Sequence, residues 1–166
     1  MISLSTRALD CFSKTFQLSD GSIVNCFIYD TCGQERYNSL NTSYYSKADA
    51  VLLVYDISNQ KSFDLIKTMY SKTIKQYCKK KIPIILLGNK TDLPDRQVKI
   101  EDGIELAINE KYGFVETSCV TNDNVAGAFE SLIEMWNIEN RRNNDENSTL
   151  VLGKDENKVK ESKCKC

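Results

Sequence analysis

Two nearly continuous apolar runs constrain the fold of this chain more than any other feature. They are "ADAVLLVYDIS" at residues 48–58 and "IPIILLGNKTD" at residues 82–92, and each ends in polar residues. Strands with apolar residues at consecutive positions are buried on both faces, which is typical of a parallel sheet covered by helices. Residues 62–77, between the runs, have helical spacing with Ser62 as a candidate N-cap. This order of elements predicts an α/β domain with a mostly parallel sheet.

Further strands and helices flank the two runs. We predict strands at residues 10–18 and 22–30 around the turn formers "SDG", and a short strand "FVETS" later in the chain. Residues 100–113 have helical spacing, with Gly113 placed to end the helix, and residues 124–140 predict a last amphipathic helix. Ligands of such sheets bind at the carboxyl ends of the strands, so the loops there are the candidate sites.

The polar end of the chain differs in composition from the rest. From about Arg141 onward the apolar pattern thins and Asn, Glu and Lys dominate. Such a segment cannot bury enough apolar surface to order itself. We therefore expect a folded domain over residues 1–140 and a disordered tail over residues 141–166.

Composition excludes several classes of site and partner. The formal net charge is -1, so we expect no nucleic acid partner. The chain has no histidine, which excludes imidazole catalysis and imidazole metal ligation. We interpret the 7 cysteines as thiols in a reducing cytosol, because their spacing suggests neither a disulfide framework nor a metal site. The sequence has no apolar run long enough to cross a bilayer and no secretory signal core at its start.

The first candidate loop is "DTCGQE", directly after the predicted strand that ends at Asp30. The Asp30 carboxylate can hold a magnesium ion through water, and Gly33 lets the backbone approach a terminal phosphate. The amide of Gln34 can orient an attacking water. A plain strand-to-helix turn uses the same residue types, and for this loop alone we favour that interpretation.

The other two loops follow the later strands. In "GNKTD", Asp92 offers two oxygens to the ring N–H and exocyclic amine of guanine, Asn89 can bond a ring nitrogen, and the Lys90 stem can lie along the base. In "ETSCVTN", Ser118 can bond neighbouring backbone and the Cys119 N–H can donate to a base carbonyl. The alternatives are a solvated loop of turn formers for the first and a helix N-cap for the second.

The three loops in this order, together with the terminal "CKC", resemble the Rab branch of the Ras-like small GTPases. "DTCGQE" resembles that family's DTAGQE, "NKTD" its NKxD and "TSCVTN" its TSAKTN, and the similarity runs from about Thr6 to Trp136. The resemblance implies the three-layer fold of P-loop NTPases of Ras type. It also implies a switch that binds GTP or GDP with Mg²⁺ and hydrolyses GTP to GDP and phosphate.

The resemblance assigns roles to individual residues. Gln34 would position the hydrolytic water, Thr6 and Asp30 would hold the magnesium ion, and Cys11, Tyr29 and Tyr44 would form the apolar surface that meets effectors. The implied GTP site consists of Asp30, Thr31, Cys32, Gly33, Gln34, Asn89, Lys90, Asp92, Ser118 and Cys119. For Cys11, ordinary strand packing explains the residue equally well.

One part of the family pattern does not occur in this sequence. There is no phosphate loop of the form G-x-x-x-x-G-K-[ST], and with it we expect the family's first strand and first helix to be missing. That strand lies mid-sheet in the family, between the strand ending at Asp30 and the one containing Val54. We therefore expect unpaired strand edges inside the core and poor nucleotide binding by these 166 residues alone. A fragment of a longer chain, or a divergent relative whose gap a partner fills, would explain this.

The terminal "CKC" resembles the Rab terminus that receives two geranylgeranyl groups, here on Cys164 and Cys166. Two lipid chains anchor stably where one does not, and the neighbouring lysines favour an anionic membrane. The resemblance implies a location on the cytoplasmic face of membranes with a cytosolic pool. The alternative is a solvated tail with two free thiols.

Three functions therefore compete. The first is a Rab-type switch in vesicle traffic, whose partners would be effectors, exchange and activating factors, prenylation escort proteins and membrane-extraction proteins. The second is a lipid-anchored interaction module that neither binds nor hydrolyses nucleotide. The third is a fragment that does not fold.

Overall fold

The computed structural model describes residues 10–30, 45–78 and 81–152, of which Asp10 and residues 143–152 are described by their backbone alone. The strands are β1 (Asp10–Gln17), β2 (Ile23–Asp30), β3 (Val51–Asp56), β4 (Ile84–Asn89) and β5 (Gly113–Thr117). The helices are α2 (Gln60–Leu65), η2 (Ile66–Tyr70), α3 (Ser71–Tyr77), α4 (Ile100–Glu110) and α5 (Val125–Leu152), with η2 a π-helical turn between α2 and α3.

The two apolar runs of the sequence lie side by side in a parallel sheet of order β3-β4-β5. β3 pairs with β4 from Val51↔Ile84 to Asp56↔Asn89, and β4 pairs with β5 as far as Asn89↔Thr117. Every residue of β4 from Ile84 to Gly88 is buried, as a strand covered on both faces requires. The predicted α/β domain with a parallel sheet is confirmed.

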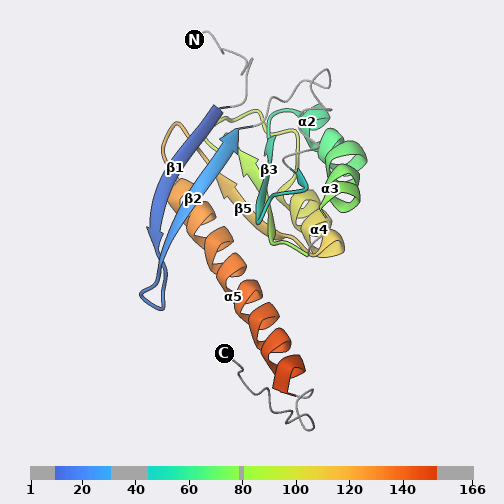
Figure 1. Ribbon diagram of the computed structural model, residues 1–166. Helices are drawn as coiled ribbons and strands as arrows, with labels where there is room; N and C mark the ends of the chain where they lie inside the picture. The colour runs from blue at the N-terminus through green and yellow to red at the C-terminus, as the bar shows by residue number, and fades with distance from the viewer. Residues whose placement is uncertain (1–9, 31–44, 79–80, 153–166) are drawn as a thin grey trace, which may run out of the picture.

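Helices cover both faces of the parallel sheet (Figure 1). On one face, Leu53, Tyr55 and Leu86 pack with Phe63 and Ile66 of the α2–η2 helix, in the larger of two buried clusters. On the other face, the long helix α5 contacts β4 and β5 and then runs past the β1–β2 hairpin (Figure 1). The result is a layer of helices, a sheet layer and a second helical layer.

The β1–β2 hairpin forms a sheet of its own. β1 and β2 pair antiparallel from Asp10↔Asp30 to Gln17↔Ile23, and among the described residues no strand joins this pair to β3. The Val54 side chain of β3 is 54% exposed, although its strand neighbours Leu53 and Tyr55 are buried. This division agrees with the expectation of unpaired strand edges between β2 and β3.

A second buried cluster attaches the hairpin to α5. Phe16 and Leu18 pack against Ile133, with Phe129 beside them and its ring stacked at 6.4 Å from that of Phe16. The Ser19 N–H donates to a Glu134 carboxylate oxygen at 2.6 Å. Among the described residues, α5 is therefore the main link between the hairpin and the rest of the fold.

Two predicted helix ends were wrong. Asn59, not Ser62, is the N-cap of α2, because the Ser62 hydroxyl donates to the Asn59 carbonyl from inside the helix, at 2.7 Å. Helix α4 ends at Glu110 with Lys111 in the left-handed region at φ 61°, so Gly113 is free to begin β5. A lysine side chain tolerates this conformation only at a cost that glycine avoids, which is why the sequence favoured Gly113.

The last helix is longer than its apolar pattern. α5 continues to Leu152, past Arg141, where the sequence becomes polar. The division into a domain and a tail near residue 140 stays a prediction. Within the described part of the chain, no helix combines the length and apolar character that a membrane span needs.

Candidate nucleotide site

The site is built where β4 and β5 end. These strands are parallel neighbours, so the loops that follow Asn89 and Thr117 emerge at the same edge of the sheet. Lys90 turns the chain sharply after β4, with a left-handed φ of 73°. The sheet register thus brings together the two segments that the sequence assigned to guanine recognition.

Hydrogen bonds join the two loops into one unit. The Asn89 Oδ1 atom accepts from the Thr117 hydroxyl at 3.2 Å and from the Cys119 N–H at 3.3 Å. The Ser118 hydroxyl donates to Asp92 Oδ1 at 2.6 Å. These bonds fix the amide of Asn89 and the carboxylate of Asp92 relative to the backbone of the second loop.

Ser118 is the centre of this arrangement. Its side chain is buried, and its oxygen also accepts a hydrogen bond from the Thr121 N–H at 3.1 Å. Asp92 and Cys119, by contrast, are exposed. A carboxylate has about four lone-pair positions, so the bond from Ser118 orients Asp92 and leaves it capacity to accept from a ligand.

Lys90 makes a contact that the sequence did not reveal. Its ammonium group pairs with Asp56 Oδ2 at 2.5 Å, at the carboxyl end of β3. Burial of Asp56 opposes its ionisation, but hydrogen bonds from Lys90 and from Ser58 outweigh that effect and lower the pKa of the carboxyl group. The available signal in the sequence was the acidic residue Asp56 near the end of the apolar run at residues 48–58.

A bidentate ion pair between Arg96 and Glu116 lies beside the two loops. Arg96 donates to both carboxylate oxygens of Glu116, at 2.6 and 2.9 Å, and to the Val98 carbonyl at 3.2 Å. Glu116 lies on β5, immediately before Thr117. This pair ties the segment after β4 to β5 and was not predicted from the sequence.

The first candidate loop is described only at its start. Asp30 is the last residue of β2 and pairs in register with Asp10. The remaining predicted members of the site and of the lipid anchor lie outside the described residues: Thr6, Thr31, Cys32, Gly33, Gln34, Tyr44, Cys164 and Cys166. The convergence of this loop with the other two stays a prediction.

Two residues of the predicted effector surface are direct neighbours. Cys11 and Tyr29 pair across the hairpin, and both side chains are exposed, Tyr29 by 48%. The alternation along β2 places Ile23 and Phe27, both exposed, on the same face. The sequence analysis missed these last two, although the period-two pattern could have identified them.

The amino-acid sequence is similar to known proteins over most of its length. A model of the Ras family matches residues 3–138. The chain belongs to the Ras family. Human "Ras-related protein Rab-8B" is 41% identical over 152 residues, which cover 90% of this chain and 72% of the relative. Mouse "Ras-related protein Rab-37" is 38% identical over 162 residues, covering 97% of this chain and 72% of the relative.

These similarities make the chain a Rab-type Ras-like small GTPase by family. Bovine "Ras-related protein Rab-8A" is also 41% identical, over 130 residues that cover 78% of this chain and 62% of the relative. The predicted Ras-like fold class is confirmed with the family. Members of this family generally use GTP or GDP with Mg²⁺ and meet effectors and regulators of Rab type.

Proposed function

We propose that this protein is a guanine-nucleotide-dependent switch in vesicle-mediated membrane traffic, held on the cytoplasmic face of membranes by lipid on Cys164 and Cys166. The observation that carries the nucleotide assignment is the junction of the two loops through Asn89, Asp92 and Ser118. The terminal "CKC" and the Rab-type family support the membrane anchor. Effectors would dock on the face that displays Cys11 and Tyr29.

In the proposed complex, each loop residue has a separate task. Asp92 accepts hydrogen bonds from the ring N–H and the exocyclic amine of guanine, Asn89 holds the second loop, and the Cys119 N–H turns to the base carbonyl. A bound Mg²⁺ would neutralise phosphate charge, and Asp30, an oxygen ligand at a strand end, fits its preference. Gln34 would then orient the water that attacks the terminal phosphate.

The test of guanine recognition is a change of base preference. Replacing Asp92→Asn exchanges one carboxylate oxygen for an amide donor, which suits the second carbonyl of xanthine instead of the amine of guanine. We expect the full-length gene product to lose about 100-fold in GDP affinity, equivalent to about 2.7 kcal/mol, and to gain affinity for xanthosine diphosphate. Calorimetric titration with both nucleotides in Mg²⁺ measures this. Failure of the unmodified protein to bind GDP or GTP would end the proposal.

A nucleotide-independent interaction module is the second candidate. It is favoured by the sequence, which contains no G-x-x-x-x-G-K-[ST] motif. The Gln34→Leu substitution separates the two functions. In a working switch it slows GTP hydrolysis by about 10-fold or more, since the attacking water loses its orienting amide. Single-turnover hydrolysis and the fraction of bound GTP provide the readouts, and no change in either favours the module.

A further inference from the structure

Asp56, at the carboxyl end of β3, uses its two carboxylate oxygens for two different partners. The Oδ1 atom accepts from the Ser58 N–H at 2.8 Å and from the Ser58 hydroxyl at 2.6 Å, within the turn that follows the strand. The Oδ2 atom pairs with the ammonium group of Lys90 at 2.5 Å. Because Ser58 fixes the orientation of the carboxylate, the second oxygen is held facing Lys90.

The backbone on both sides of Lys90 is fixed as well. Lys90 has a left-handed φ of 73°, a conformation that is costly for a residue with a β-carbon. Before it, the Asn89 carbonyl accepts from the Ile57 N–H at 3.1 Å. After it, the Thr91 N–H donates to the Thr117 carbonyl, also at 3.1 Å. These bonds hold the turn to β5 and to the residue after β3, so the lysine side chain is directed across the end of β3.

The Lys90 side chain is anchored at its ammonium end and yet remains accessible. Its side chain is 50% exposed, whereas that of Asp56 is 20% exposed. The stem of an unanchored lysine is flexible and loses that freedom when a ligand orders it. A lysine that is anchored beforehand loses less, which is the general advantage of preorganisation in binding.

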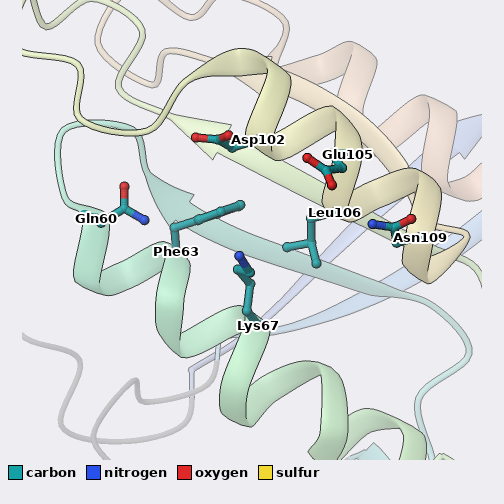
Figure 2. A pocket seen from close by; sticks show the side chains of 7 residues that line it. All are labelled: Gln60, Phe63, Lys67, Asp102, Glu105, Leu106 and Asn109. Atoms are coloured by element: carbon teal, nitrogen blue, oxygen red, sulfur yellow. The ribbon is translucent and has the colours of Figure 1, made fainter.

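A second lysine shows that nearby carboxylates alone do not produce such a pair. Lys67 reaches into a pocket of about 240 Å³ between the α2–η2 helix and α4, which Asp102 and Glu105 also line (Figure 2). Among these described residues no ion pair within 4.0 Å joins Lys67 to either carboxylate. Its ammonium group lies instead 5.6 Å from the centre of the Phe63 ring. Lys67 is therefore a matched comparison for Lys90, outside the candidate nucleotide site.

We propose that Asp56 is a positioning residue of the guanine site, an inference that rests on the nucleotide-binding function proposed above. Asp56 holds the ammonium group of Lys90, so that the lysine stem is ready to lie along the face of the base. Asp92 recognises the edge of the same base. Asp56 acts through Lys90 and makes no contact with the nucleotide itself.

The opposite role for this pair would be a lock. If Lys90 had to leave Asp56 before a nucleotide could bind, breaking the pair would tighten binding. Two observations favour positioning instead. Half of the Lys90 side chain is exposed while the pair is intact. The pair also coexists with the bonds that join the two loops, from Ser118 to Asp92 and from Cys119 to Asn89.

The first test is Asp56→Asn, measured on the full-length gene product. The substitution keeps the oxygen that Ser58 binds and exchanges the oxygen that faces Lys90 for an amide donor. We expect GDP to bind about three- to tenfold more weakly, as the loss of one preorganised side chain predicts. The control Lys67→Met removes an ammonium group outside the site and should leave GDP affinity unchanged. Calorimetric titration in Mg²⁺ measures both, and thermal melts verify that the variants fold.

A double-mutant cycle separates positioning from a general structural effect. Lys90→Met breaks the same pair from its other side and should weaken GDP binding by a similar factor, which also tests the inference if Asp56→Asn fails to fold. In the Lys90→Met background Asp56 has nothing to hold, so Asp56→Asn should change the affinity by less than about twofold. In the Lys67→Met background the full loss should remain.

Acetylation of the lysine amines reports the ion pair without any nucleotide. An ammonium group in an ion pair must leave its partner before its nitrogen can react. With limiting acetic anhydride we expect Asp56→Asn to speed the acetylation of Lys90 by about threefold, as a pair of modest strength predicts, while Lys67 keeps its rate. Mass spectrometry of the digested protein gives both rates.

Three results would overturn this inference alone. GDP binds the Asp56→Asn variant as tightly as the unmodified protein or more tightly, the loss persists undiminished in the Lys90→Met background, or the acetylation rate of Lys90 does not change. Failure of the unmodified protein to bind GDP is a different outcome, because it ends the nucleotide proposal and this inference with it.

Discussion

The hydroxyl group of Tyr55 is one of a few buried polar groups of the described core that lack a hydrogen-bond partner. The Tyr55 side chain is buried between β4 and α4, and its hydroxyl has no hydrogen-bond partner among the described residues. Burial, together with the negative charge of Glu116, raises the pKa of Tyr55 to about 12. A buried polar group without a partner lowers stability, because water satisfies it in the unfolded chain.

Tyr55→Phe should therefore stabilise the protein. The substitution removes only the unpaired hydroxyl, and we expect a gain of about 1 kcal/mol in the free energy of unfolding at neutral pH. Urea denaturation measures this gain as a higher midpoint concentration with an unchanged m-value. A loss of stability would show that the hydroxyl has a favourable contact.

The same substitution has a defined pH dependence. The folded-state pKa of Tyr55 is raised above the ordinary value of 10, so the folded state binds the proton more tightly than the unfolded state does. Stability contributed by this difference is complete below pH 10 and is lost as the pH rises toward 12. The advantage of Tyr55→Phe should therefore grow over this range, which denaturation at several alkaline pH values checks.

At the scale of the helix, two glycines differ in the space around them. A β-carbon on Gly103 of α4 would stand 2.7 Å from the Tyr55 hydroxyl and 2.6 Å from the Phe114 ring, whereas one on Gly127 of α5 would meet nothing within 4 Å. Gly103 is thus required for α4 to approach the sheet, and Gly127 only weakens its own helix.

We expect the two alanine substitutions to have opposite signs. Gly103→Ala should cost about 1–3 kcal/mol through overpacking, and Gly127→Ala should gain about 0.5–1 kcal/mol through helix propensity. Chemical denaturation of both variants provides the comparison. If both substitutions changed the free energy of unfolding equally, the backbone conformation of glycine, rather than the close approach of α4 to Tyr55, would determine the stability.

Elements were predictable where one local pattern decides them. The apolar runs of β3 and β4 and the turn formers between β1 and β2 identified the strands, and the polar residues after β4 and β5 identified their common edge. Helix ends were less predictable, because Ser62 and Asn59 are both capping residue types and only the path of the chain decides between them. The ion pair of Arg96 and Glu116 forms only in the tertiary fold, so no local sequence pattern predicts it.

At the scale of the whole molecule, the described fold consists of two sheets joined by one helix. The hairpin meets the rest through Phe16 and Leu18 on Ile133 of α5, while the larger cluster around Ile66 holds the parallel sheet. Two cores connected in this way should open separately, as cooperative units in other folds do.

Matched isoleucine truncations test this separation. Ile133→Ala removes the hairpin contact and Ile66→Ala removes a contact of the parallel sheet, each at a cost of about 2–5 kcal/mol. We expect Ile133→Ala to speed amide hydrogen exchange in β1 and β2 while β4 stays protected, and Ile66→Ala to affect β4. Equal acceleration in both sheets for both variants would contradict two separate units.

The contacts between the middle of α5 and the hairpin have a mechanical consequence. Arg141 and Asn137 both bond to the Asp20 carboxylate at the tip of the hairpin, and Glu134 holds the backbone of Ser19 next to it. This same helix is the last described element of the chain. A force applied to the C-terminal end, as from a tether under tension, therefore loads the hairpin tip first and reaches the parallel sheet only afterwards.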